Sequence, residues 1–424
     1  MVSFGHSVHH LWGDRGDDVG AGIERTGRGW LFEDADFDYE SRIVLGAAAC
    51  GTGDVGIVLA TLDRIADGDA QSWFDAWVRT ATVLTERGDA ALKAGRTATA
   101  RWALLAAAEY YGKALVFIDG MADRSVLLPT FREHRACWEK VVDASEGCYV
   151  RVPVPCEGQS MPGYLLRPDA SGASRPTLVF TNGSDGSLPG LLGYGAGEAV
   201  ARGWNAYVFD GPGQQSMLFE HGVPFRHDWE AVLTPVLDTL VARPDVDERA
   251  LTGYGISQGG YWITRALAFE HRLRAAVADP GVVDVSAPWT AALPAQALSL
   301  LRDGRGDEFN AVMSAHADPA QARTLAFRAK PYRARDLFEL FTEVRRFQVR
   351  DVVNDIVTPV LVLDPADEQF FPGQSRELYD LLPGDKAIAP FTQDQGANFH
   401  CQPTGRRLTH TLMLDYLADR LAPP

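Results

Sequence analysis

The sequence predicts an α/β protein with a mostly parallel, doubly wound sheet, a helical domain before the sheet and a helical insertion within it. Three observations support this fold class. Short apolar runs alternate with helical stretches over residues 146–282 and 351–424, which is typical of parallel strands covered on both faces. Residues 1–145 and 283–350 instead are mostly helical in pattern, although residues 1–35 show no clear periodicity. A Gly-x-Ser-x-Gly pentapeptide, residues 255–259, lies between an expected strand and an expected helix.

The first 145 residues are expected to form a mostly helical domain. Between Gln71 and Arg87, the apolar side chains of Trp73, Phe74 and Trp77 roughly follow one stripe of a helix. The helical stretches in this part are Tyr39–Ala49, Val55–Ala66, Gln71–Arg87 and the long run Asp89–Phe117.

The strands of the sheet are expected in residues 146–282 and 351–424. Cys148–Val154 and Met161–Pro168 should pair antiparallel across a turn at Glu157-Gly158. The strands that follow are Pro176–Asn182, Trp204–Asp210, Ala250–Gly255, Ala275–Asp279, Pro359–Asp364 and Ala387–Phe391, with helices at Gly195–Arg202, Trp229–Ala242 and Thr404–Leu421. Residues 283–350 are expected to lie above the carboxyl ends of the strands, where open sheets bind ligands. Their helices are Leu298–Asp303, Ala320–Ala329 and Arg335–Val349.

The pentapeptide has the context of a nucleophile elbow, in which a strand turns abruptly into a helix. The turn is so tight that residues two positions on either side of the serine can hardly carry side chains, which explains Gly255 and Gly259. Ser257 at the apex is therefore the candidate nucleophile. On this fold, the α/β-hydrolase fold, the chain order of a catalytic triad is serine, acid, histidine.

The histidine and the acid are expected after the last two strands. His400 lies in the loop between Ala387–Phe391 and the final helix, where the triad histidine belongs. The loop after Pro359–Leu363 carries three carboxylates, Asp364, Asp367 and Glu368. Glu368 stands three residues after Pro365 and four before Pro372, the position usual for the acid. Asp367 is the second candidate because aspartate is commoner in this role.

The oxyanion hole requires two backbone amides. One is expected from Gln258, directly after the nucleophile. The other is expected from the small residues after Pro176–Phe180, where Gly183 or Ser184 is the candidate donor. Residues 210–214, Asp-Gly-Pro-Gly-Gln, are interpreted as a rigid turn that supports the elbow.

The composition excludes several classes of function. The 424 residues include 56 acidic and 40 basic side chains, and a net charge of −16 argues against a nucleic-acid partner. We see no signal peptide and no apolar stretch of the roughly 18 residues that a membrane span needs. Five scattered cysteines indicate reduced thiols in a cytoplasmic protein. We expect a small-molecule substrate and neither a metal nor an organic cofactor; the oligomeric state stays open and allows a homo-oligomer.

Several motifs together resemble one branch of the α/β-hydrolases. They are Gly-x-Ser-Gln-Gly-Gly at 255–260, Asp-Gly-Pro-Gly-Gln at 210–214, and Asp-Pro-x-x-Glu-Gln-Phe-x-Pro-Gly-Gln-Ser at 364–375 followed by His400-Cys401. The branch includes 2,6-dihydroxypseudooxynicotine hydrolase, the fungal polyketide chain-shortening hydrolases and the fermentation-respiration switch protein family. In the bacterial group with the third motif, the residue matching 367 need not be acidic, which favours Glu368. The nicotine-pathway enzyme has an aspartate in a shorter loop, so the resemblance leaves Asp367 open.

The resemblance implies hydrolysis of a C–C bond beside a carbonyl, or of an ester, through an acyl-enzyme. The substrate would be a small organic molecule, with polyketide-like and aromatic compounds among the candidates. Two alternatives remain: an acyl transferase or cyclase that uses the same triad, and a catalytically inactive binding protein. We further expect the helical domain and the insertion to cover Ser257 together, because the elbow lies at the carboxyl end of the sheet and the insertion leaves the chain at that same end.

Overall fold

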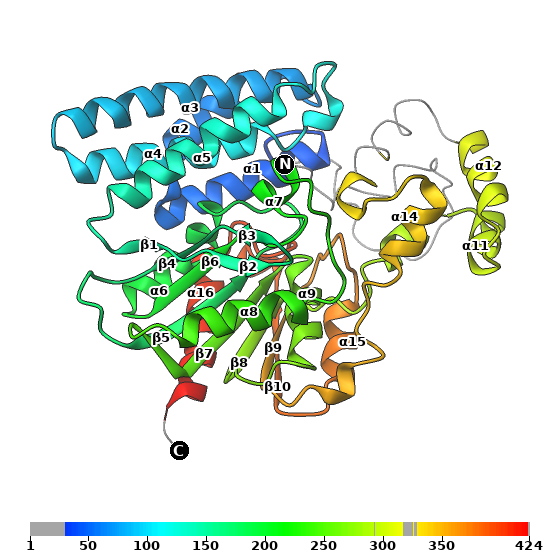
Figure 1. Cartoon of the computed structure of the whole chain (residues 1–424). Helices are drawn as coiled ribbons and strands as arrows, with labels where there is room; N and C mark the ends of the chain where they lie inside the picture. Colours follow the sequence, from blue (N-terminus) through cyan, green and yellow to red (C-terminus); the bar gives the residue numbers. More distant parts are fainter. Residues whose placement is uncertain (1–29, 292, 317–324, 326–328, 423–424) are drawn as a thin grey trace.

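The structure is a computed structural model that describes residues 30–291, 293–316, 325 and 329–422 (Figure 1). The start of the expected helical domain and most of the expected helix Ala320–Ala329 lie outside the described residues. Within the described residues, eight strands form one sheet in the order β1-β4-β6-β5-β7-β8-β9-β10. The strands are β1 Tyr149–Arg151, β4 Gly163–Leu166, β5 Arg175–Thr181, β6 Asn205–Phe209, β7 Val246–Ile256, β8 Ala275–Asp279, β9 Val360–Pro365 and β10 Lys386–Phe391. The six strands from β6 to β10 in that order are parallel, and β1 and β4 are antiparallel to their neighbours, so the predicted fold class is confirmed.

The expected antiparallel pair after residue 147 is split between two sheets. The turn at Glu157-Gly158 is present, but it joins β2 Val154–Cys156 to β3 Gln159–Met161 in a separate two-stranded sheet. Only β1 and β4 enter the main sheet. Pro153 and Pro162 stand at the two breaks, and proline has no N–H to donate to a strand ladder. The expectation of two continuous strands was therefore wrong.

Five helices precede the sheet in the described part of the chain: α1 Ala35–Ala47, α2 Val55–Leu62, α3 Ala70–Lys93, α4 Thr97–Ala114 and α5 Leu127–Asp143. The expected helix Asp89–Phe117 was wrong, because the chain reverses at Gly95 and continues as α4 beside α3 (Figure 1). Gly95 has φ +68°, a left-handed conformation that glycine adopts without strain and that commonly ends a helix. None of the described helices combines the length and apolarity needed to cross a membrane.

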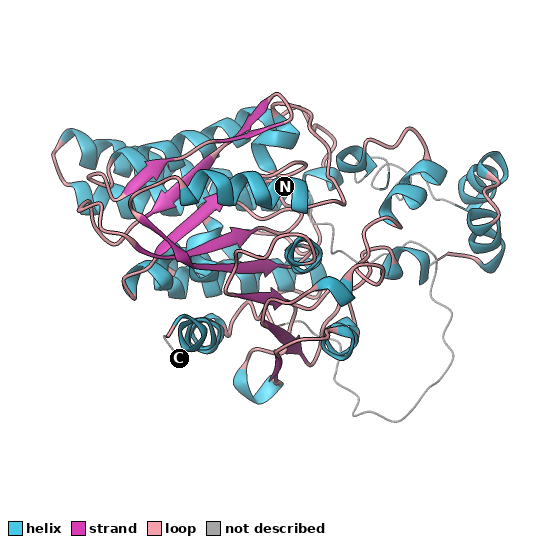
Figure 2. Cartoon of the chain, turned by 60° about the horizontal axis from the view of Figure 1, so that its bottom comes forward, coloured by secondary structure: helices cyan, strands magenta, loops and turns pink. Residues whose placement is uncertain are grey.

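Two hydrophobic cores lie on opposite faces of the sheet, between the helices that flank the strands in Figure 2. Along β5, Leu178 and Phe180 enter one core while Val179 enters the other, as the two-residue period of a strand requires. The first core includes side chains of α1–α5, α6 Gly197–Ala201 and α16 Arg406–Leu421. The second includes side chains of α7 Gln215–Phe219, α8 Glu230–Val241, α9 Gly259–Leu267 and α15 Gln374–Leu381.

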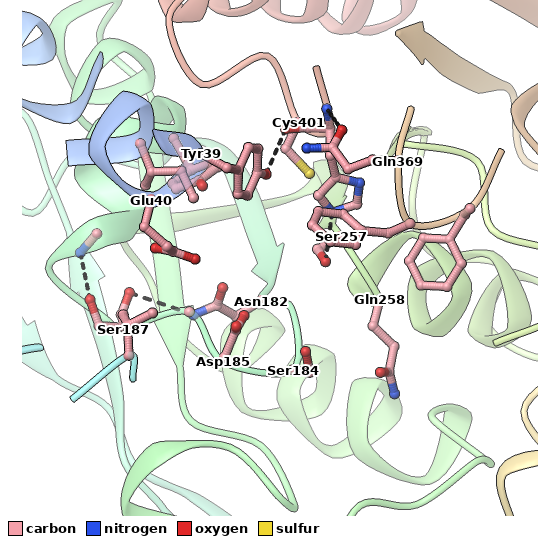
Figure 3. A pocket seen from close by; sticks show the side chains of 18 of the residues that line it. Tyr39, Glu40, Asn182, Ser184, Asp185, Ser187, Ser257, Gln258, Gln369 and Cys401 are labelled. Carbon is pink, nitrogen blue, oxygen red and sulfur yellow. Dashed lines mark hydrogen bonds between the residues drawn. The ribbon is translucent and has the colours of Figure 1, made fainter. Parts of the chain in front are cut away.

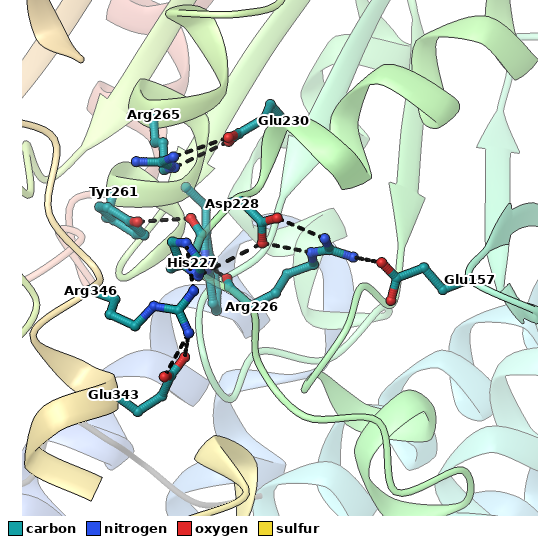
Figure 4. A network of polar contacts seen from close by, with 10 residues as sticks. Glu157, Arg226, His227, Asp228, Glu230, Tyr261, Arg265, Glu343 and Arg346 are labelled. Atoms are coloured by element: carbon teal, nitrogen blue, oxygen red, sulfur yellow. Dashed lines mark hydrogen bonds and ion pairs between the residues drawn. The ribbon is translucent and has the colours of Figure 1, made fainter. Parts of the chain in front are cut away.

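The insertion between β8 and β9 packs into the second core. Its described helices are α10 Ala287–Ala291, α11 Ala295–Arg302, α12 Gly306–His316 and α14 Leu337–Val344. A polar network joins it to the core (Figure 4). Arg346, just after α14, lies 2.9 Å from Glu343 and 3.1 Å from His227 Nε2, and Tyr261 of α9 donates a 2.8 Å hydrogen bond to the His227 carbonyl. Shorter helical turns lie at Ala48–Thr52, Ile118–Gly120, Leu192–Ala196, Lys330–Tyr332, Val353–Asp355 and Gln393–Gln395.

Candidate active site

The Gly-x-Ser-x-Gly segment forms the sharp turn between β7 and α9. Ser257 has φ +57°, a strained value for a residue with a side chain. A Cβ added to Gly255 would lie 2.2 Å from the Gly259 carbonyl oxygen, and one added to Gly259 would lie 2.3 Å from the Thr181 carbonyl oxygen. Both contacts are impossible, so the steric reason expected for the two glycines is confirmed. The first amides of α9 lie directly after Ser257 and Gln258, where a helix N-terminus favours negative charge.

Ser257, His400 and Glu368 form a continuous hydrogen-bonded chain. His400 Nε2 lies 2.9 Å from Ser257 Oγ, and His400 Nδ1 lies 2.8 Å and 2.9 Å from the two Glu368 carboxylate oxygens. Both the imidazole and the Glu368 carboxylate are only 5% exposed. Glu368 Oε1 also accepts the amides of Phe370 and Phe371, at 2.9 and 3.0 Å, which holds the carboxylate towards the histidine.

The other two candidate acids point elsewhere. Asp367 is exposed and accepts a 2.5 Å hydrogen bond from the Asn398 side chain, while its amide donates to the Asn398 carbonyl. It therefore joins the acid loop to the histidine loop. Asp364 forms an ion pair of 2.7 Å with Arg376. Burial raises the pKa of Asp364, and Arg376 opposes that rise. Of the three carboxylates, only Glu368 contacts His400 in the described structure.

The loop after β5 lies against the nucleophile. A Cβ added to Gly183 would be 2.9 Å from Ser257 Cβ, which places this backbone beside the serine. The Gly183 amide donates a 2.9 Å hydrogen bond to the Asn182 side chain. Ser184 and Gln258 both line the same cavity as Ser257 (Figure 3).

Gln214, the last residue of Asp-Gly-Pro-Gly-Gln, fixes this loop. Its Nε2 donates to the carbonyls of Asn182 and Gly183, at 2.9 and 3.0 Å, and its Oε1 accepts the Gly211 amide at 2.8 Å. The side chain is 1% exposed. The sequence predicts that this motif supports the elbow, and the hydrogen bonds of Gln214 instead hold the loop after β5, which lies beside the elbow. Sequence reasoning did not assign this role to Gln214.

Asp210, the first residue of the same motif, connects it to the helices before the sheet. Its buried carboxylate forms an ion pair with Arg135 of α5 and accepts a 2.6 Å hydrogen bond from Ser216 Oγ. Tyr39 of α1 makes a second connection, since its hydroxyl donates a 2.9 Å hydrogen bond to the His400 carbonyl. Helices α1 and α5 therefore contact the histidine loop and the Asp-Gly-Pro-Gly-Gln turn, respectively.

Asp279, at the end of β8, ties the elbow to the histidine loop. Its carbonyl accepts the Ser257 amide at 2.6 Å and the Cys401 thiol at 3.1 Å. Its carboxyl group contacts the Tyr254 hydroxyl at 2.6 Å and Gln402 Nε2 at 2.9 Å. Asp279 thus holds both the Ser257 backbone and the two residues that follow His400.

The candidate site opens into a cavity lined by both helical segments. Tyr39 and Lys113 come from the helices before the sheet, and Trp289 comes from the insertion. The expectation that both segments line the cavity over Ser257 is confirmed. Ser257 is half-buried. In the part of the chain that the structure describes, no group of three or more histidine, cysteine, aspartate or glutamate residues could hold a metal ion.

Comparisons with known proteins agree with this fold. No family model matches the chain. Hydrolase acrC of Aspergillus aculeatus is 33% identical over 267 residues, which cover 59% of this chain and 62% of the relative. Hydrolase LUC6 of a Fusarium species is 31% identical over 264 residues, covering 60% and 62%. The chain therefore spans about six tenths of the length of these curated relatives.

The crystal structure of 2,6-dihydroxy-pseudo-oxynicotine hydrolase superimposes with a TM-score of 0.69 at 19% identity, covering 89% of this chain and 95% of that one. Sheet order, elbow and structural likeness show that the chain has the α/β-hydrolase fold. The likeness to 2,6-dihydroxy-pseudo-oxynicotine hydrolase that the sequence motifs suggest is thus confirmed at the level of the fold.

Proposed function

We propose that this chain is a serine hydrolase that works through an acyl-enzyme, with Ser257 as nucleophile, His400 as general base and acid, and Glu368 as the orienting carboxylate. The observation that carries the proposal is the unbroken chain from Ser257 Oγ through the imidazole to Glu368, with links of 2.9 and 2.8 Å. A serine hydroxyl is a weak nucleophile until a base accepts its proton, and this geometry supplies that base. Glu368 would hold the Nδ1–H tautomer and stabilise the imidazolium.

In the first half of the reaction, Ser257 Oγ bonds to the substrate carbonyl carbon while its proton moves to His400 Nε2. The leaving group then departs with the electrons of its bond to that carbon and takes the proton from Nε2. In the second half, water attacks the acyl-enzyme, and its proton passes to Nε2 and then to the serine oxygen. The products are a carboxylic acid and the protonated leaving group.

The oxyanion formed in each half needs two N–H donors. The Gln258 amide, beside the N-terminus of α9, is one proposed donor. Ser184 is the second, in preference to Gly183, because the Gly183 amide already donates to Asn182. Gln214 supports this arrangement by holding the two preceding carbonyls.

We propose that residues 1–145 and 283–350 act as a cap that sets specificity on the core of residues 146–282 and 351–424. Exclusion of water strengthens the oxyanion contacts and protects a carbanionic leaving group until His400 protonates it. This suits cleavage of a C–C bond beside a carbonyl at least as well as ester hydrolysis. The cavity lining by Tyr39, Lys113 and Trp289 supports the cap.

The test uses the purified protein and a p-nitrophenyl ester. Ser257→Ala and His400→Ala should each lower kcat by roughly 10⁴-fold or more, because the triad acts as a unit. Ser160→Ala, at an exposed serine in β3, is the matched control and should keep wild-type turnover. Circular dichroism establishes that the variants are folded. Turnover near wild type in either triad variant would refute the assignment.

A further inference from the structure

Three charged side chains from the helices before the sheet reach the cavity that contains Ser257. Glu40 belongs to α1, and Glu109 and Lys113 lie one turn apart on α4. All three are buried, with exposures of 4–6%. In Figure 3, Glu40 and Ser187 stand on one side of the cavity and Gln258 on the other, with Ser257 between them. The cavity therefore has a polar end away from the nucleophile.

Two of the three charged side chains in this cluster pair with each other, and the third, a carboxyl group, is left without a charged partner of its own among the described residues. Lys113 Nζ donates a 2.6 Å hydrogen bond to Glu40 Oε2, which neutralises both charges and joins α1 to α4. Glu109 is the surplus carboxyl group: its Oε2 accepts a long hydrogen bond of 3.4 Å from Ser187 Oγ. Joining the helices does not require Glu109, because the Glu40–Lys113 pair already does so.

Burial of a surplus carboxyl group is costly unless something compensates it. Burial raises the pKa of the Glu109 carboxyl group, and the nearby Glu40 adds to this rise. The Lys113 ammonium group and the Ser187 hydroxyl oppose it. Of the other buried residues of this helix, six are alanine, and Lys113 is the only other one with a charged side chain. A carboxyl group at the border of a cavity, in such surroundings, is positioned to meet a ligand.

We propose that Glu109 and Ser187 bind a hydroxyl group of the substrate, at the end of the cavity away from the carbonyl that Ser257 attacks. This inference rests on the proposed function and deepens it. A hydroxyl can donate to the Glu109 carboxyl group and accept from a neighbouring donor, so it matches a mixed site. The cluster already contains one cation, the Lys113 ammonium group, and a hydroxyl can bind there without adding a second one.

The experiment compares p-nitrophenyl esters of straight-chain acids that end in a hydroxyl with unsubstituted esters of the same chain length. In the wild type, kcat/KM should favour the hydroxyl ester at one chain length, by roughly 10- to 100-fold, as for a buried hydrogen bond to a charged group. In Glu109→Leu, this ratio should fall to about one. Glu86→Leu, at an exposed glutamate of α3, is the matched control and should keep the wild-type ratio.

Two further arms keep the proposal falsifiable. Esters that end in an ammonium group should show no advantage, and a preference for them in the wild type would overturn the assignment. If Glu109→Leu does not fold, the wild-type series alone decides: no hydroxyl preference at any chain length overturns the inference. That failure is distinct from failure of the proposed function, in which the wild type hydrolyses none of the esters through Ser257.

Discussion

At the scale of single residues, the proposed catalytic triad depends on which carboxylate contacts His400. Asp364 lies near the end of β9, Asp367 and Glu368 follow the strand directly, and the directions of the three side chains distinguish them. Glu368 faces the imidazole, Asp367 faces Asn398, and Asp364 faces Arg376. The spacing of residues 364–372 favours Glu368 as the acid, and the geometry of the three side chains agrees with that choice.

This geometry predicts different losses for two conservative substitutions. Glu368→Gln should lower kcat by about 10³- to 10⁴-fold, because a neutral amide neither stabilises the imidazolium nor selects the correct tautomer. Asp367→Asn should cost roughly threefold or less, since the exposed carboxylate only joins two loops. Steady-state kinetics of both variants on one ester decide the matter. A larger loss in Asp367→Asn would move the role of acid to Asp367.

At the scale of elements, the site is assembled from loops that separate elements hold. Gln214, in the loop after β6, donates hydrogen bonds to the loop after β5. Asp279, at the end of β8, forms hydrogen bonds with both the elbow and the histidine loop. Arg135 of α5 pairs with Asp210 at the base of the Gln214 loop. The helices before the sheet thus reach the candidate oxyanion loop through one buried ion pair.

Gln214 is therefore expected to act as a positioning residue. Gln214→Glu keeps the size of the side chain but removes both donated hydrogen bonds to the loop carbonyls. It should lower kcat by roughly 10- to 100-fold, less than the loss of a whole oxyanion donor, with a smaller change in KM. Gln71→Ala, at an exposed glutamine of α3, should leave both constants unchanged. An increase in KM alone, with kcat unchanged, would show that Gln214 serves substrate binding instead.

At the scale of the whole molecule, the sequence predicts what depends on local pattern. The alternation of strands and helices, the elbow and the late histidine follow from spacing, and steric crowding explains Gly255 and Gly259. Breaks set by single residues were missed, such as the reversal at Gly95 that divides α3 from α4.

Contacts between distant segments were also beyond prediction. Tyr39 meets the His400 carbonyl across 361 positions of sequence, and Glu109 meets Ser187 across 78. No periodicity or motif records such a pairing, because it depends on how the helices before the sheet pack against the core. The proposed substrate end of the cavity therefore emerged only from the three-dimensional arrangement.

The central claim is that Ser257 is an activated nucleophile, and covalent trapping tests it most directly. A fluorophosphonate probe incubated with the wild type at neutral pH should attach to one residue, and peptide mass spectrometry should locate the added mass on Ser257. Ser257→Ala should take up no probe, and His400→Ala should react far more slowly because the serine loses its base. Labelling of Ser257→Ala at the wild-type rate, or no labelling of the folded wild type, would contradict the account.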